Sequence, residues 1–293
     1  MELVHDSSMR VSVGDVRLFF DIEGAHLVAQ SDAMEARPTL LLLHGGPGAD
    51  HTFFKPEFSA MADAAQVVYL DQRGSGRSDR GDREKWTWDQ WADDIAGFCE
   101  AVDIDKPVLV GTSSGGMVAL ICAIQHPGLV AGLVLDSTLG VPTTLEETLA
   151  VFERRGGAAA RDAASSYFGG DTSSATVSAW KEHCLPLYGN EEEMQSRRAR
   201  ADINDEVQEH FRQGGCGPTD ISSTVDTITC PTLILAGADD PVSPSAAAQR
   251  LADSLVNSSV ETAILAGVGH GVFRQAPQQA FALLRAFLHR STP

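Results

Sequence analysis

The stretch PVLVGTSSGGMVAL, residues 107–120, decides the fold. An aliphatic run ends at Gly111, two serines and two glycines follow, and a second apolar run then begins. The segment GTSSG fits the pattern G-x-S-x-G between a strand and a helix, a turn that holds its central serine in a strained conformation with the hydroxyl exposed. The alternative is a turn of small residues that only packs the strand against the helix.

The spacing of the glycines distinguishes the two serines. Residues two positions to either side of the nucleophile must be small, because the strand and the helix approach each other closely there. Gly111 and Gly115 flank Ser113 in this way, whereas Thr112 occupies the corresponding position for Ser114. The pattern therefore predicts that Ser113 is the nucleophile.

The rest of the chain alternates between short aliphatic runs and helical patterns. Unbroken aliphatic runs are typical of parallel strands that are covered on both faces. The predicted strands lie at 39–45, 65–74, 106–113, 130–137, 230–237 and 260–267. The predicted helices lie at 86–102, 115–127, 243–255 and 277–289, and residues 9–24 read as an antiparallel hairpin. This order predicts an α/β fold with a mostly parallel, doubly wound sheet.

The alternation stops between about residues 139 and 226. This region is charged and helical in pattern, with no convincing buried strand. A connection of that length inside a compact domain is unusual unless it has a function. We therefore expect a core formed by residues 1–138 and 227–293, and a helical cap inserted at 139–226.

A serine nucleophile needs a base and a carboxylate that orients the base. His270 follows the last predicted strand, and Asp240 follows the strand before it, in the chain order expected for such a fold. The pattern G-x-x-D-x-x-x-P favours Asp240 over the adjacent Asp239. Asp136, directly after the strand at 130–137, is a further candidate for the acid.

Acyl transfer also needs N–H groups that stabilise the developing oxyanion. The turn HGGPG at 44–48 brings glycine backbone close to a ligand, and Gly46 is the expected donor there. The second expected donor is the N–H of Ser114, at the start of a helix. We expect the other residues of the turn, namely His44, Gly45, Pro47 and Gly48, to shape the site, with His44 as a structural hydrogen-bonding residue.

These segments together resemble the α/β-hydrolase superfamily, and within it the prolyl iminopeptidase-like branch. The motifs that carry the resemblance are HGGPG at 44–48, DQRGSGRS at 71–78 and the turn at Ser113. The resemblance covers the predicted core. It implies a Ser113–Asp240–His270 triad with Gly46 and Ser114 as oxyanion donors, and it implies that Asp71 and Arg73 brace the turn beneath the site.

The sequence departs from that branch in two respects. Ser114 occupies the position after the nucleophile, where the iminopeptidases carry an aromatic residue. Their caps also supply acidic residues that hold the free amino group of the substrate. Glu153, Glu182 and residues 191–193 are available for this role here, but nothing in the sequence singles one of them out.

Composition excludes several other classes of protein. The net charge of −18 disfavours binding to nucleic acid or to an anionic membrane. Five widely spaced cysteines without a C-x-x-C pair argue against a disulfide framework or a zinc site. The N-terminus has no signal-peptide pattern, and no apolar run is long enough to span a bilayer. We expect a cytoplasmic protein without metal or cofactor that acts on a small molecule or short peptide; its oligomeric state is open.

These observations predict a serine hydrolase that cleaves a small amide or peptide bond through an acyl-enzyme, as the prolyl iminopeptidases do. A carboxylesterase or lactone hydrolase of the same fold is the first alternative. A hydrolase-fold protein that only binds a small ligand is the second, although a pure binder has no need for all three triad residues.

Overall fold

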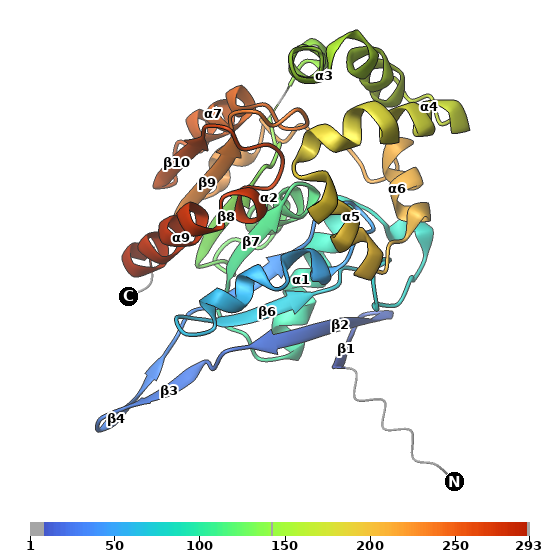
Figure 1. Cartoon of the computed structure of the whole chain (residues 1–293). Coiled ribbons are helices and arrows are strands. Elements are labelled where there is room, and N and C mark those ends of the chain that lie inside the picture. The colour runs from blue at the N-terminus through green and yellow to red at the C-terminus, as the bar shows by residue number, and fades with distance from the viewer. Residues whose placement is uncertain (1–8, 142, 292–293) are drawn as a thin grey trace.

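The centre of the molecule is an eight-stranded sheet, shown in Figure 1 for the computed structural model of the chain. The structure describes residues 9–141 and 143–291. The strand order is β1-β2-β6-β5-β7-β8-β9-β10; strands β5 to β10 are parallel, and β2 pairs antiparallel with β1 and with β6. The strands are β1 (Arg10–Val13), β2 (Val16–Glu23), β5 (Thr39–Leu43), β6 (Gln66–Leu70), β7 (Val108–Thr112), β8 (Gly132–Asp136), β9 (Thr232–Gly237) and β10 (Val260–Leu265).

Helices cover both faces of the sheet, as the aliphatic runs predict. Leu41 and Leu43 belong to a core formed with α1, α2 and α7, whereas Leu40 and Leu42 belong to a core on the other face formed with α8 and α9. Successive side chains of a strand point to opposite faces, so a strand that is buried on both sides must be apolar throughout. The helices are α1 (Trp88–Ala101), α2 (Ser114–Gln125), α7 (Ser245–Ser254), α8 (Val272–Gln275) and α9 (Pro277–Ser291).

All the predicted strands and helices of the core are present, including the hairpin of β1 and β2. A second hairpin, which sequence patterns did not predict, is formed by β3 (Leu27–Gln30) and β4 (Ala33–Ala36) and projects from the sheet in Figure 1. Its side chains are largely exposed; Leu27 and Met34 retain 53% and 60% of their accessible surface. Because neither face is buried, the hairpin lacks the alternation of apolar and polar residues that reveals most strands.

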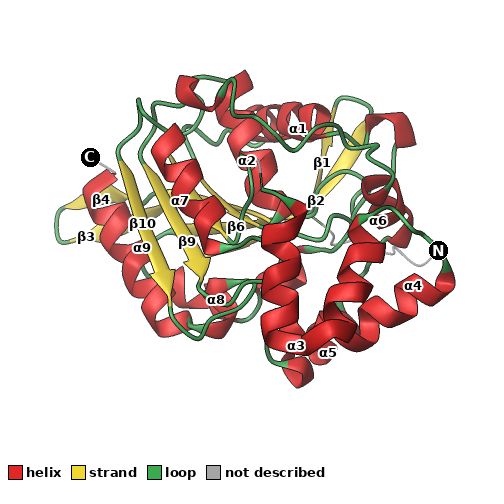
Figure 2. Ribbon diagram, turned by 90° about the horizontal axis from the view of Figure 1, so that it is seen from above, coloured by secondary structure: helices red, strands yellow, loops and turns green. Residues whose placement is uncertain are grey.

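Residues 139–226, predicted as a cap, are called the helical segment below. Their described part contains no strand. The helices are α3 (Leu145–Phe168), α4 (Ser174–Ala179), a π-helical turn (Trp180–Cys184), a 3₁₀ turn (Leu185–Tyr188), α5 (Glu191–Arg200) and α6 (Asp205–Arg212). They gather on one side of the molecule, apart from α7 and α9 (Figure 2). Thr144 and Glu147 form a capping box that begins α3.

Among the described residues, no helix combines the length and the apolar character that crossing a membrane requires. The sequence-based prediction about a signal peptide rests mainly on residues 1–8, which lie outside the described part of the chain.

Candidate active site

Ser113 lies at a sharp turn between β7 and α2. Its φ of 55° and ψ of −120° are a conformation that L-residues rarely adopt, so the backbone is strained there. A Cβ on Gly115 would clash with the carbonyl oxygen of Leu43, and one on Gly111 would clash with the backbone of Gly116. The close approach of strand and helix therefore requires glycine at both positions that flank Ser113.

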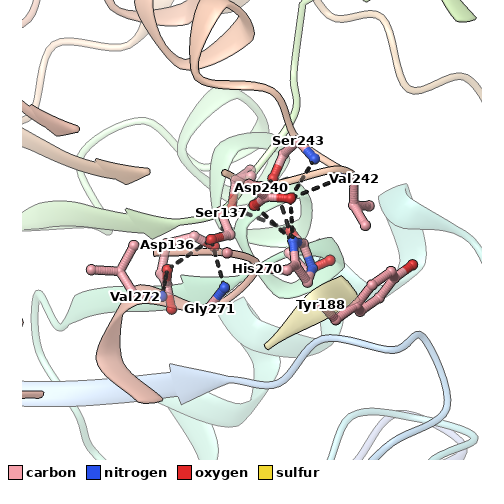
Figure 3. A network of polar contacts seen from close by, with 12 residues as sticks. Asp136, Ser137, Tyr188, Asp240, Val242, Ser243, His270, Gly271 and Val272 are labelled. Carbon is pink, nitrogen blue, oxygen red and sulfur yellow. Dashed lines mark hydrogen bonds and ion pairs between the residues drawn. The ribbon is translucent and has the colours of Figure 1, made fainter. Parts of the chain in front are cut away.

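His270 and Asp240 meet at the carboxyl end of the sheet (Figure 3). The imidazole Nδ1 lies 2.9 Å from Oδ2 and 3.1 Å from Oδ1 of Asp240. Asp240 also accepts hydrogen bonds from the backbone N–H groups of Val242 and Ser243 and from the Ser243 hydroxyl, at 2.7–2.9 Å. Burial acts to raise the pKa of Asp240, but the interaction with His270 and the bonds from Ser243 outweigh it, so the pKa lies below its usual value.

The two other candidate acids make different contacts. Asp136 accepts the N–H of Val272 on Oδ1 at 2.7 Å and the Thr112 hydroxyl on Oδ2 at 3.2 Å (Figure 3 shows the first). Burial raises its pKa, and the bond from Val272 opposes this only in part. Asp239 contacts its neighbours through its backbone, which bonds to Val268 and Arg155. In this structure only Asp240, of the three, hydrogen-bonds the ring of His270.

Two backbone N–H groups border the same site. Gly46 and Ser114 both line the cavity that contains Ser113 and His270. Neither N–H donates to an acceptor among the described residues. Gly46 has a φ of 128°, which glycine adopts without strain. A Cβ on Gly45 would lie 3.1 Å from the Cβ of Ser113, so a side chain there would crowd the serine.

The remaining residues of the HGGPG turn divide into two groups. Pro47 lines the cavity beside Gly45 and Gly46. His44 is buried and structural: its Nε2 accepts the N–H of Gln72 at 3.1 Å, and burial lowers its pKa. Gly48 lies against the helical segment, where its carbonyl accepts the N–H of Asn204 at 2.8 Å. A Cβ at this position would meet the backbone of Asn204, so Gly48 brings core and helical segment together.

The DQRGSGRS motif forms a buried network behind the turn. Asp71 accepts the N–H of His51 at 2.8 Å and lies 2.7 Å from its Nδ1. Arg73, which is only 1% exposed, makes two bonds of 2.7 and 2.8 Å to the carboxylate of Asp94. These side chains are buried: His51 and Asp71 hold the loop after β5 against the loop after β6, and Arg73 holds the latter loop against α1.

A cavity of about 600 Å³ lies between the core and the helical segment, and Ser113 and His270 are part of its wall. Most of the wall is apolar, with aromatic side chains from the core and from the helical segment, among them Phe54, Phe273 and Tyr167. An apolar pocket of this volume with a few polar groups is typical of small-molecule sites.

The acidic residues proposed from the sequence of the cap are absent from this wall. Among the described residues that line the cavity, the acids are Glu57 and Asp136, and the bases other than His270 are Arg198 and Arg274. Sequence reasoning missed Glu57, Arg198 and Arg274. No motif surrounds them, and their common feature is tertiary packing against one cavity.

Tyr188 connects the helical segment to the loop of His270. Its carbonyl accepts the N–H of His270 at 2.9 Å, and its ring lies 5.2 Å from the imidazole (Figure 3 shows both side chains). Gln275 reinforces the connection, because its Nε2 donates to the carbonyls of both Tyr188 and His270. The described residues contain no group of three or more His, Cys, Asp or Glu side chains suited to a metal ion.

Comparison with known proteins identifies the family of the fold. The profile of the alpha/beta hydrolase fold family matches residues 38–277. The chain belongs to the alpha/beta hydrolase fold family. Membership confirms the fold class that the strand order and the turn at Ser113 predict. The motifs HGGPG and DQRGSGRS predict a resemblance to the prolyl iminopeptidases. Proline iminopeptidases among the relatives of this alpha/beta hydrolase confirm that resemblance.

Two relatives cover most of this alpha/beta hydrolase. One is a Caulobacter sp. (strain K31) protein that is named as a carbamate hydrolase, RutD. It is 28% identical over 257 residues, which are 85% of this chain and 90% of the relative. A proline iminopeptidase from Lactobacillus helveticus (strain DPC 4571) is 26% identical over 267 residues, 86% of this chain and 90% of the relative. The crystal structure of a Mycobacterium smegmatis proline iminopeptidase shares the fold, with a TM-score of 0.76, 21% identity and coverage of 97% of this chain and 98% of that one.

Proposed function

We propose that the protein is a serine hydrolase that cleaves a small amide or peptide bond through an acyl-enzyme. Ser113 is the nucleophile, His270 the base and Asp240 the acid that orients it. The observation that carries this proposal is the Nδ1–Oδ2 bond of 2.9 Å between His270 and Asp240, on a cavity whose wall includes the strained Ser113. A carboxylate on Nδ1 leaves Nε2 of His270 free to accept the serine proton.

In the first step His270 Nε2 takes the hydroxyl proton of Ser113 as Oγ bonds to the carbonyl carbon. The N–H groups of Gly46 and Ser114 donate to the oxyanion, and each such donor contributes about 3 kcal/mol in enzymes of this kind. The imidazolium then protonates the leaving amine as the C–N bond breaks. Water attacks the acyl-enzyme by the same route, with its proton passing to His270 and then to Ser113.

The helical segment acts as a cap in this proposal. It supplies part of the cavity wall, including Tyr167, Tyr188 and Arg198, and it contacts the loop of His270 through Tyr188. A cap that closes over the site excludes water and selects the substrate. We propose the boundaries 139–226 for it.

Two observations bear on the bond that is cleaved. The relatives named above support an amide, peptide or carbamate bond. A cap carboxylate that could bind the free amine of an aminopeptidase substrate is missing from the described wall, which favours the ester or lactone hydrolase as second candidate. Proline and alanine p-nitroanilides beside short p-nitrophenyl esters distinguish them, since only the aminopeptidase requires the free amine.

The nucleophile is tested by Ser113→Ala, with Ser114→Ala as its matched control. Ser113→Ala is expected to abolish turnover and labelling by a fluorophosphonate. Ser114→Ala retains the backbone N–H at the same position and should still be labelled. Labelling of Ser113→Ala at the wild-type rate would remove Ser113 from the role.

A further inference from the structure

The charged groups around the cavity are unequally paired. Arg197 is buried and forms two ion pairs. Its guanidinium bonds to Glu57 Oε1 at 2.6 Å and to Glu193 Oε1 at 2.7 Å. The two arginines that line the cavity, Arg198 and Arg274, have no ion pair with a described residue. A half-buried guanidinium without a counter-ion is costly unless a ligand supplies one.

Arg274 lies on α8, four residues after His270. Its Nη2 donates to the carbonyl of His270 at 2.6 Å, and its Nη1 lies 2.6 Å from the sulfur of Met194. A guanidinium has five N–H donors, so others remain without a described acceptor. Burial lowers the pKa of Arg274, and Asp136, Glu193 and Asp240 offset this only in part.

Arg198 lies on α5, one turn after Met194. Residues four apart share a helix face, so Arg198 emerges on the same side as the sulfur that Arg274 contacts. Both Met194 and Arg198 line the cavity. Tyr167 and Tyr188 line the same cavity, and the charge of Arg198 acts to lower the pKa of both phenols.

We propose that the substrate carries a carboxylate, which Arg198 and Arg274 bind inside the cavity. This inference rests on the proposed function, and it adds the substrate class. Guanidinium groups bind carboxylates through charge-assisted and often bidentate hydrogen bonds. The aromatic wall accommodates the apolar part of such a molecule, and the reacting carbonyl faces Ser113. Glu57 Oε2, which has no partner, is the feature that an amine-bearing substrate would use instead.

The test uses ester pairs that differ in one charge. Mono-4-nitrophenyl adipate and its methyl ester place the carboxylate on the acyl side. 4-Acetoxybenzoate and its methyl ester place it on the leaving-group side. In at least one pair, the acid should be the better substrate of the wild-type protein by about tenfold in kcat/KM, the gain typical of one charge-assisted hydrogen bond.

Arg198→Gln and Arg274→Gln should each reduce that acid-to-ester ratio to near one, and Arg198→Lys should restore part of it. Arg154→Gln is the matched control: it removes the same charge from an exposed position on α3 outside the cavity wall. Reading the result as a ratio separates recognition of the carboxylate from a change in His270, whose carbonyl Arg274 contacts.

Calorimetric titration of the wild-type protein with monomethyl adipate tests the anion site without turnover. Binding should weaken about tenfold in Arg198→Gln and remain at the wild-type value in Arg154→Gln. Acid-to-ester ratios near one in both ester pairs, or equal binding by wild type and Arg198→Gln, would overturn the proposal, as would a strict requirement for a free amine. If none of the esters is hydrolysed, the p-nitroanilides and the fluorophosphonate labelling of Ser113 test the proposed function, and the titration decides the anion site by itself.

Discussion

Two buried aspartates of the site differ in the direction of their pKa shifts. Asp240 and Asp136 both lie buried at the carboxyl end of the sheet. Asp240 accepts several N–H and O–H bonds and interacts with His270, so it stays ionised. Asp136 accepts bonds from Val272, Thr112 and Ser137 but does not bond to the ring of His270, and burial raises its pKa. The immediate surroundings therefore lower the pKa of one aspartate and raise the pKa of the other.

Asp240→Asn should lower kcat by about 10⁴-fold, because the amide no longer stabilises the imidazolium or fixes the tautomer of His270. Asp239→Asn is the neighbouring control, since Asp239 bonds to Val268 and Arg155 through its backbone. Steady-state kinetics at pH 7.5 provide the measurement. A fall of less than tenfold in Asp240→Asn would assign the acid role elsewhere.

Asp136→Asn should change the dependence of stability on pH. A carboxyl whose pKa is raised on folding destabilises the folded state as pH rises above its unfolded value of 3.8. The Asn variant, which keeps an acceptor for the N–H of Val272, is therefore expected to gain stability relative to wild type between pH 4 and pH 7. Urea unfolding at both pH values measures this. An equal difference at pH 4 and pH 7 would contradict it.

At the scale of elements, the two glycines that flank Ser113 were predictable from a local steric demand, and the positions of the core strands along the chain were predictable from unbroken aliphatic runs. Gly111 and Gly115 are required where β7 meets α2, and this requirement shows directly in the sequence. The hairpin of β3 and β4 was not predictable, since its exposed side chains carry no pattern. Arg198 and Arg274 lie on helices from different parts of the chain, and only packing shows that they share a cavity.

Gln275 links two elements by donating to the carbonyls of Tyr188 and His270, while its Oε1 accepts the N–H of Gly269 at 2.9 Å. We expect Gln275→Leu to lower kcat about tenfold through a displaced His270, and to slow fluorophosphonate labelling in proportion. Exposed Gln279→Leu on α9 is the control. Unchanged labelling together with reduced thermal stability would indicate a purely structural role.

At the scale of the whole molecule, Arg197 joins the helical segment to the core. It reaches Glu57 and the carbonyl of Phe53, and its side chain is only 3% exposed. Arg197→Met leaves Glu57 and Glu193 without their shared cation, so the free energy of unfolding should fall by about 3–5 kcal/mol. Arg200→Met on the exposed side of α5 should cost less than 1 kcal/mol. Urea titrations compare the two; similar losses would show that burial of Arg197 is unimportant.

The bond between the Tyr188 carbonyl and the N–H of His270 has a consequence for how the protein matures during synthesis. Ser113 is synthesised early, whereas His270, the base in the proposed mechanism, follows the helical segment and β10. A chain still on the ribosome at residue 240 would carry the proposed nucleophile without its base. Under the proposed mechanism, the site would therefore become able to react only late in synthesis, when His270 has joined the fold.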